Sequence, residues 1–169
     1  MQFEEIETCL MGQDRVREAW RRLLHGRQFI HREDFTVGCV GVELAHISIL
    51  ACEGGRFRFR LAGSGLRAAF GCEPRGLCAQ DIELCRDSTV WTELAAKALA
   101  RLAPVSGRTV MADGTIHYWM RLPMSSDGVM ADLVLCHDRY LPADSLEDPE
   151  AAARAADAAL RRDTVRMAA

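Results

Sequence analysis

The glycine pair Gly54-Gly55, between two runs of alternating residues, is the sequence feature that most restricts how this chain folds. Two consecutive glycines accept the positive φ angles that a two-residue hairpin turn requires. After the pair, arginines alternate with Phe57, Phe59 and Leu61, a period of two that places the two sets on opposite faces of a strand. The segments on either side of the glycines are therefore predicted to form an antiparallel hairpin with one apolar and one basic face.

The rest of the chain predicts an α+β fold around this hairpin. In the first strand, residues 44–52, alternation places Ile47, Ile49 and Ala51 on one face and His46, Ser48 and Leu50 on the other. Residues 63–87 read as short helical segments, and residues 88–103 as a longer helix that Pro104 ends. Strands are then expected at 105–112, 116–124 and 129–138. This order predicts a five-stranded antiparallel sheet with helices on one face.

Both ends of the chain predict further helices. Asp14 is expected to cap a helix that runs to about His25, and the apolar stripe along it comprises Val16, Trp20, Leu23 and Leu24. The stripe implies either a cover for the sheet within one chain or a seam between two copies. An alanine-rich helix is expected from Asp148 to about Arg162. We divide the chain into a helix and loop at 1–35, a central domain at 36–140 and a tail at 141–169.

The hairpin also carries a family resemblance. The strand FRFRLAGS enters a short helix that ends in Phe70-Gly71, and an isolated Gly76 follows. This pattern resembles a bacterial branch of the PAS superfamily, over roughly residues 15–138. The resemblance implies a non-enzymatic sensory or adaptor module that acts as a homodimer. It also implies a signalling partner such as a histidine kinase or a cyclic-dinucleotide enzyme.

Two cofactors of PAS-like proteins are not expected here. The family's flavin-bonding motif has Asn before and Arg after its cysteine, whereas Cys78 lies between Leu77 and Ala79. Heme-binding relatives commonly supply a histidine from the long helix, and residues 88–103 contain none. We therefore expect neither flavin nor heme, and the identity of any ligand stays open.

PAS-like sheets often enclose an apolar pocket with their helices. The candidate lining residues are Phe57, Phe59, Leu61, Phe70, Trp91, Tyr118 and Met120, although apolar side chains at strand and helix spacing are core residues by default. Alternation places Trp119, with His117 and Arg121, on the opposite face from Tyr118. We expect these three side chains to lie beside the arginine face of the hairpin, either under the N-terminal helix or open to a partner. The candidate dimer or partner residues are Val16, Trp20, Leu23, Leu24 and Trp119.

The alternative function is an enzyme or a small-molecule carrier that uses the same cavity as its site. Cys136 and His137 are adjacent on a strand, so their side chains point to opposite faces and cannot activate each other. Glu43 and His46 lie near one strand, but no two carboxylates share a face. The seven cysteines lack the paired spacing of a zinc site. We therefore predict no catalytic residue and no metal site.

Composition excludes several other classes of protein. A net charge of -3 argues against a general binder of nucleic acid, although the arginine face leaves that alternative open to a binding test. The acidic start MQFEEIETCL has no basic region followed by an apolar run, so no signal peptide is expected. No segment approaches the roughly 20 apolar residues of a membrane span. These features predict a cytoplasmic protein.

Overall fold

The hairpin around Gly54-Gly55 forms as predicted. In the computed structural model, which describes residues 2–86 and 88–142, β2 (Ile47–Glu53) pairs antiparallel with β3 (Arg56–Ala62). Gly54 and Gly55 have φ angles of 56° and 79°. Both values lie in the left-handed region that glycine adopts without steric cost.

The C-terminal meander completes the sheet. It consists of β4 (Val105–Val110), β5 (Ile116–Ser125) and β6 (Leu133–Leu141). β5 pairs with both β4 and β6, and β6 pairs antiparallel with β2. The predicted α+β fold with an antiparallel sheet is therefore confirmed for β2 to β6. A short sixth strand, β1 (Ile30–His31), adds parallel to the end of β5, so that the described sheet is mixed.

Short helices cover one face of the sheet. They are α2 (Ser64–Phe70), η4 (Ala79–Asp81), α3 (Glu83–Arg86), η5 (Thr89–Trp91) and α4 (Glu93–Arg101). α2 ends at Gly71, which is left-handed with a φ of 66°. The single helix predicted over 88–103 is divided here into η5 and α4.

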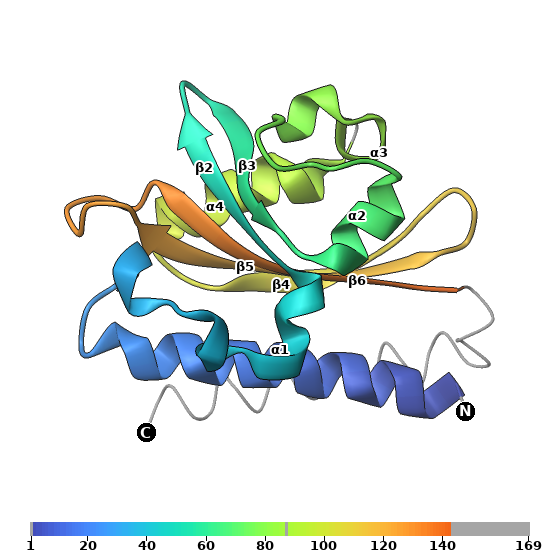
Figure 1. Ribbon diagram of the computed structural model, residues 1–169, viewed down its shortest axis with the longest axis horizontal. Helices are drawn as coiled ribbons and strands as arrows, with labels where there is room; N and C mark the ends of the chain where they lie inside the picture. Colours follow the sequence, from blue (N-terminus) through green and yellow to red (C-terminus); the bar gives the residue numbers. More distant parts are fainter. Residues whose placement is uncertain (1, 87, 143–169) are drawn as a thin grey trace.

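The N-terminal helix covers the opposite face, which corrects the expectation that helices lie on one face only. α1 (Gln2–Leu24) runs along the underside of the sheet in Figure 1. Val16 and Trp20 are buried there, and the Trp20 indole N–H donates to the carbonyl of Pro123 at 2.9 Å. Of the two alternatives for the stripe, the structure shows cover within one chain. Asp14 does not cap α1 but lies inside it, 3.4 Å from Arg17.

The segment between α1 and β2 forms 3-10 turns. They are η1 (Arg32–Asp34), η2 (Val37–Cys39) and η3 (Gly41–His46), and they pass beside α1 in Figure 1. η3 brings Glu43 beneath the sheet, where its side chain is buried. The helix predicted from Asp148 to Arg162 lies outside the described residues.

A β-bulge in β3 changes which face its residues share. Leu50 of β2 pairs with Phe59, whereas the preceding Ile49 pairs with Leu61, so Arg60 is an extra residue on β3. One extra residue reverses the alternation beyond it. Phe57 and Phe59 therefore pack under the short helices, while Leu61 packs on the α1 side.

Candidate functional site

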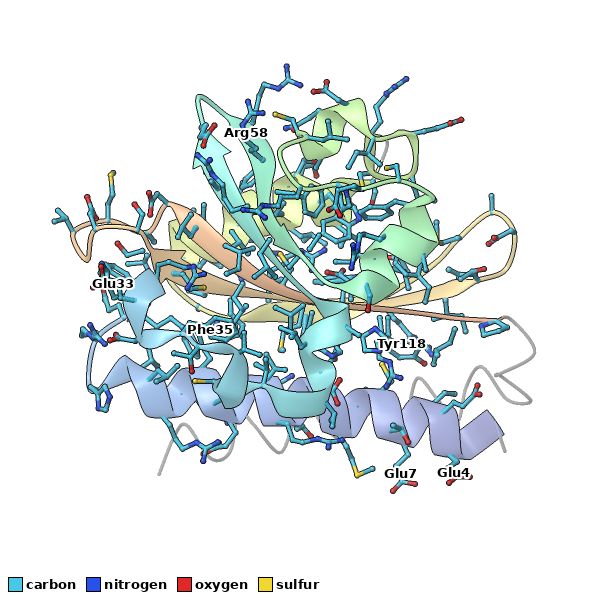
Figure 2. All side chains as sticks on the ribbon, in the orientation of Figure 1. Glu4, Glu7, Glu33, Phe35, Arg58 and Tyr118 are labelled. Carbon is cyan, nitrogen blue, oxygen red and sulfur yellow. The ribbon has the colours of Figure 1, made fainter. Side chains whose placement is uncertain are left out.

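The seven predicted pocket residues do not meet in one place. Phe59, Phe70 and Trp91 pack together under the short helices, with ring centroids 5.4 to 5.9 Å apart, and Phe57 belongs to the same cluster. Leu61, Met120 and Tyr118 lie on the α1 side of the sheet, where Figure 2 labels Tyr118. The sheet itself separates the two groups, so they cannot line one cavity.

A buried ion pair lies at the centre of the helix-covered face. Arg121 on β5 and Asp138 on β6 have fully buried side chains. The Arg121 guanidinium donates to both Asp138 carboxylate oxygens, at 3.0 and 2.9 Å, and to the carbonyls of Val90 and Met120. Its charged centre lies 4.3 Å from the Trp91 ring centroid, within the range of a cation–π contact. Paired hydrogen bonds of this kind fix the guanidinium in one orientation.

His117 extends this contact into a stack of rings. Its Nε2 lies 2.7 Å from an Asp138 oxygen, and since the carboxylate accepts, the imidazole donates. The imidazole lies between Trp91, at 5.8 Å, and Tyr140, at 4.3 Å, with nearly parallel planes. We call Arg121, Asp138, His117, Trp91 and Tyr140 the Asp138 cluster. It occupies the space between the sheet and the short helices.

The Asp138 cluster keeps its carboxylate ionised. Burial alone would raise the pKa of Asp138, but the charge of Arg121 and the hydrogen bonds from His117 and Arg121 outweigh it and hold the pKa below its ordinary value. No polar atom of Arg121 or Asp138 is among the buried atoms without a partner. The cluster is therefore a saturated network.

The expected position of Trp119, His117 and Arg121 beside the arginine face is wrong. Trp119 is buried under the short helices and donates from its indole N–H to the Thr109 hydroxyl at 3.1 Å. The arginines of β3 instead form ion pairs at the outer end of the hairpin, where Figure 2 shows Arg58. Alternation shows which residues of one strand share a face, but it does not fix the phase between two strands.

A second buried polar group lies on the α1 side of β6. Nε2 of His137 is 3.0 Å from a carboxylate oxygen of Glu43, and both side chains are almost fully buried. Arg15 of α1 approaches the same carboxylate at 3.6 Å, and the ring of His46 lies 6.0 Å from that of His137. Nδ1 of His137 and Nε2 of Gln13 are buried without a hydrogen-bond partner. We call Glu43, His137, Arg15 and His46 the Glu43 cluster.

Two pKa values in the Glu43 cluster are lowered. The hydrogen bond from His137 is the main cause that lowers the pKa of Glu43, against the opposing effect of burial. Burial, together with the charges of Arg139 and His137, lowers the pKa of His46. Both shifts favour an ionised carboxylate beside a neutral His46.

The cysteines do not form a nucleophilic site with these histidines. Cys136 faces the short helices and His137 faces α1, as expected for neighbours on a strand. Burial raises the pKa of the Cys136 thiol to about 12, so the reactive thiolate is scarce near neutral pH. Within the described residues, no three His, Cys, Asp or Glu side chains are arranged to hold a metal ion.

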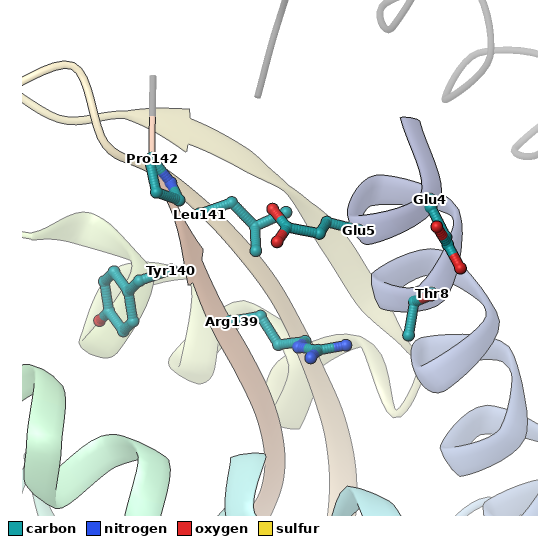
Figure 3. Close-up of a pocket in the computed structure, with 7 residues that line it drawn as sticks. All are labelled: Glu4, Glu5, Thr8, Arg139, Tyr140, Leu141 and Pro142. Atoms are coloured by element: carbon teal, nitrogen blue, oxygen red, sulfur yellow. The ribbon is translucent and has the colours of Figure 1, made fainter. Parts of the chain in front are cut away.

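An open pocket of about 530 Å³ lies between the start of α1 and the end of β6. Figure 3 shows Glu4, Glu5 and Thr8 on one wall and Arg139 to Pro142 on the other. None of the seven predicted pocket residues lines it. This pocket is polar at its rim and differs from the expected apolar cavity.

Comparison with known families agrees with this architecture. A PAS domain family model matches residues 10–119. The chain belongs to the PAS domain family. PAS domains are in general sensory and signalling modules rather than catalysts. A comparison with characterised proteins gave no match, and none of the helices that the structure describes is long and apolar enough to cross a membrane.

The PAS match ends inside β5, before the residues that complete both clusters. His137 and Asp138 lie on β6, beyond residue 119. Neither the role of Asp138 nor the contact between Glu43 and His137 was predicted from the sequence. One signal was present in the sequence: His137 and Asp138 are polar residues in a strand that is otherwise mostly apolar, a pattern typical of buried, partnered groups.

Proposed function

We propose that this PAS protein is a non-enzymatic sensory adaptor that passes its signal to another protein by direct contact. The observation that carries the proposal is the Asp138 cluster, which fills the space between sheet and short helices with the chain's own side chains. A small ligand entering there would have to displace stacked rings and separate a fully buried ion pair. Breaking such a pair costs several kcal/mol, on the order of 3 to 5.

A rigid loop supplies a surface for such contacts. Val129 and Met130, between β5 and β6, are 80% and 63% exposed. A carboxylate oxygen of Asp127 accepts from both of their backbone N–H groups, and the Ser125 hydroxyl donates to the carbonyl of Met130 at 2.6 Å. A loop that is already ordered loses little conformational entropy when it binds. We therefore assign these two apolar side chains to the partner contact.

The candidate partners are a histidine kinase or a cyclic-dinucleotide enzyme, as the PAS resemblance implies, and the protein itself is proposed to form a homodimer. The dimer seam proposed from the sequence needs revision. Val16, Trp20 and Trp119 are buried within one chain, and Leu23 and Leu24 pack partly against the same core. A Trp20→Glu variant would therefore disrupt the packing of α1 on the sheet of its own chain instead of testing a dimer.

Native mass spectrometry and light scattering of the purified protein test this function. We expect no stoichiometric small molecule and a dimer whose fraction rises with protein concentration. A bound small molecule in every chain would favour the carrier or enzyme alternative. A monomer at all concentrations would refute the homodimer.

The partner contact needs a separate binding experiment. The histidine kinases and cyclic-dinucleotide enzymes of the source organism are purified and titrated with the wild type and with the double variant Val129→Asp, Met130→Asp. We expect at least one partner to bind, with affinity reduced at least about tenfold by the charged pair. Glu7→Ala, on the outer side of α1, is the control. Binding that the loop variant leaves unchanged would rule out this surface.

A further inference from the structure

The interface between α1 and the sheet is mostly apolar but contains a buried site with ionisable side chains. On either side of it, Cys9 and Val16 of α1 are completely buried against apolar residues. Between them, Gly12 lies against the carboxylate of Glu43, which accepts a hydrogen bond from His137. Polar groups are energetically costly to bury. The stability of the contact between α1 and the sheet therefore depends on whether these groups are protonated and hydrogen-bonded.

Gly12 is required by the position of this carboxylate. A Cβ atom at residue 12 would lie 2.6 Å from the nearer carboxylate oxygen of Glu43, too close for any real contact. Glycine inside a helix costs roughly 0.5 to 1 kcal/mol relative to alanine. The carboxylate is the end of a flexible chain, but the bond to His137 and the approach of Arg15 restrain it. α1 therefore rests directly on the Glu43–His137 pair.

The pair has no place for a second proton. His137 uses Nε2 to donate to Glu43, and its Nδ1 is buried without a partner. In the neutral ring, Nδ1 carries only a lone pair. A proton added there would become a buried donor with no acceptor, which costs about 1 to 3 kcal/mol.

The charged groups around the pair are mostly positive. The titratable and charged side chains that face it are Arg15 and Cys9 from α1, His46 from η3, Arg139 from β6 and, through the sheet, Asp138. The Cys9 thiol stays neutral, because burial raises its pKa to about 12. A proton taken up by His46 therefore adds a buried positive charge near two arginines, and the carboxylates of Glu43 and Asp138 only partly offset the effect of burial.

We propose that the Glu43–His137 pair beneath Gly12 is a proton-sensitive latch, which holds α1 on the sheet at neutral pH and releases it when the cluster takes up protons. Release exposes the apolar face of α1 and the sheet surface beneath it. The latch acts on a helix that any signalling partner would meet at the surface. The proposal does not depend on the identity of that partner.

The direction of the pH effect follows from His46. Its pKa is lower in the folded protein than its ordinary value of 6.5, chiefly because the ring is buried, so the chain binds the proton more tightly when that burial is lost. Docking is therefore strongest above that ordinary value and weakens as the pH falls through it toward the lowered folded value.

Hydrogen exchange read by mass spectrometry tests the latch. After correction for intrinsic rates, amides of residues 9–20 should exchange faster, by roughly an order of magnitude, at about pH 5 than at about pH 8, because the docked state disfavours the added proton. Amides of β5 and β6 should not change. Exchange of α1 that does not depend on pH, or that rises equally in the sheet, would overturn the proposal.

Replacing the two histidines tests whether their protonation, and not their packing, causes the pH dependence of α1 exchange. Glutamine keeps an N–H donor for Glu43 but does not titrate, so the double variant His46→Gln, His137→Gln should lose the pH dependence of α1 exchange. The matched control, exposed His25→Gln, should retain it. If the double variant fails to fold, Glu43→Gln serves instead, and pH dependence equal to that of the wild type in a folded variant contradicts the proposal.

Gly12→Ala gives a test that does not depend on pH. Alanine favours an isolated helix, but here its Cβ collides with the Glu43 carboxylate, so α1 should exchange faster at every pH. The second substitution Glu43→Ala removes the carboxylate and with it the collision, so the double variant should exchange no faster than Glu43→Ala alone and should lack the pH dependence of the wild type. A Gly12→Ala variant whose α1 exchanges as slowly as the wild type would show that Glu43 does not set the docking.

Discussion

Both faces of β6 contact a buried carboxylate, but the two carboxylates have different numbers of hydrogen-bond and charge partners. Neighbouring residues His137 and Asp138 point to opposite sides of the sheet, and each takes part in a buried contact between an imidazole and a carboxylate. On the helix-covered side, Asp138 accepts from Arg121 and His117 and is fully buried. On the α1 side, Glu43 has a single imidazole donor, a half-exposed arginine 3.6 Å away and a neighbouring nitrogen without a partner.

This difference means that the Asp138 cluster fixes one arrangement of the chain, whereas the contact at the Glu43 cluster can be weakened. A saturated network of buried charges is strongly destabilised when one member is removed, and it therefore holds one arrangement. An incompletely satisfied pair stabilises its interface less and responds to a change in protonation. The short helices are therefore fixed to the sheet, whereas α1 is attached in a way that a modest change can weaken.

The largest expected effect is on the saturated side. Asp138→Ala leaves the Arg121 charge buried without a partner and should lower the free energy of unfolding by about 3 to 5 kcal/mol, measured by urea denaturation. The double variant Arg121→Met, Asp138→Leu should lose less than the single variant, because it leaves no uncompensated charge. A loss of under about 1 kcal/mol for Asp138→Ala would mean that the cluster is not a lock.

A smaller loss is expected on the α1 side. Glu43→Ala leaves the imidazole N–H of His137 without an acceptor and should cost about 1 to 3 kcal/mol in the same urea experiment. Glu43→Gln keeps an acceptor and should cost less. If Glu43→Ala costs as much as Asp138→Ala, the proposed contrast between the two faces disappears.

Acid should act on the two faces in sequence. His46, with its lowered pKa, contributes stability that is present above its ordinary value of 6.5 and is lost as the pH falls below it. Glu43 and Asp138 also have lowered pKa values, but their contributions are lost only below the ordinary values of 4.5 and 3.8. The urea midpoint should therefore fall slightly between about pH 8 and about pH 5. His46→Gln should remove this early fall, and a midpoint that still falls in that variant would assign the change to another group.

The smallest effect is expected at the exposed end of the hairpin. Glu53 pairs with Arg58 and Arg60, and all three side chains are well exposed to solvent. Glu53→Ala should leave the urea midpoint unchanged within error, because solvent screens exposed ion pairs. A clear fall in the urea midpoint would show that the exposed ion pairs of the hairpin stabilise the protein.

Much of the fold could be predicted from local patterns. The glycine pair, the alternation in β2 and the turns of the meander depend on neighbouring residues. The structure confirms the strands that they predict, although β2 begins at Ile47 and β6 at Leu133, later than expected. The faces assigned to Ile47, Ile49 and Leu50 are also correct. The helix expected to begin at Asp14 was too short, since α1 begins at Gln2 and its acidic first turn was not recognised as a helix start.

The candidate site was less predictable, because it depends on distances along the chain. Arg121 meets Asp138 only through the register of β5 and β6, and Glu43 meets His137 across 94 residues. The assumption that Leu61 shares a face with Phe59 failed because no local pattern reveals the bulge at Arg60. Alternation also does not show whether His117 lies on the same face of the sheet as the arginines of β3.

The sequence by itself determined the hairpin, the order of strands and helices and the resemblance to PAS domains, because turn chemistry and periodicity act between residues close in the chain. Only the tertiary structure decided that α1 covers the second face and that two carboxylates become buried on opposite sides of β6. The physical reason is that burial and pairing of charge depend on strand register and helix docking. Both arise from contacts between segments far apart in sequence.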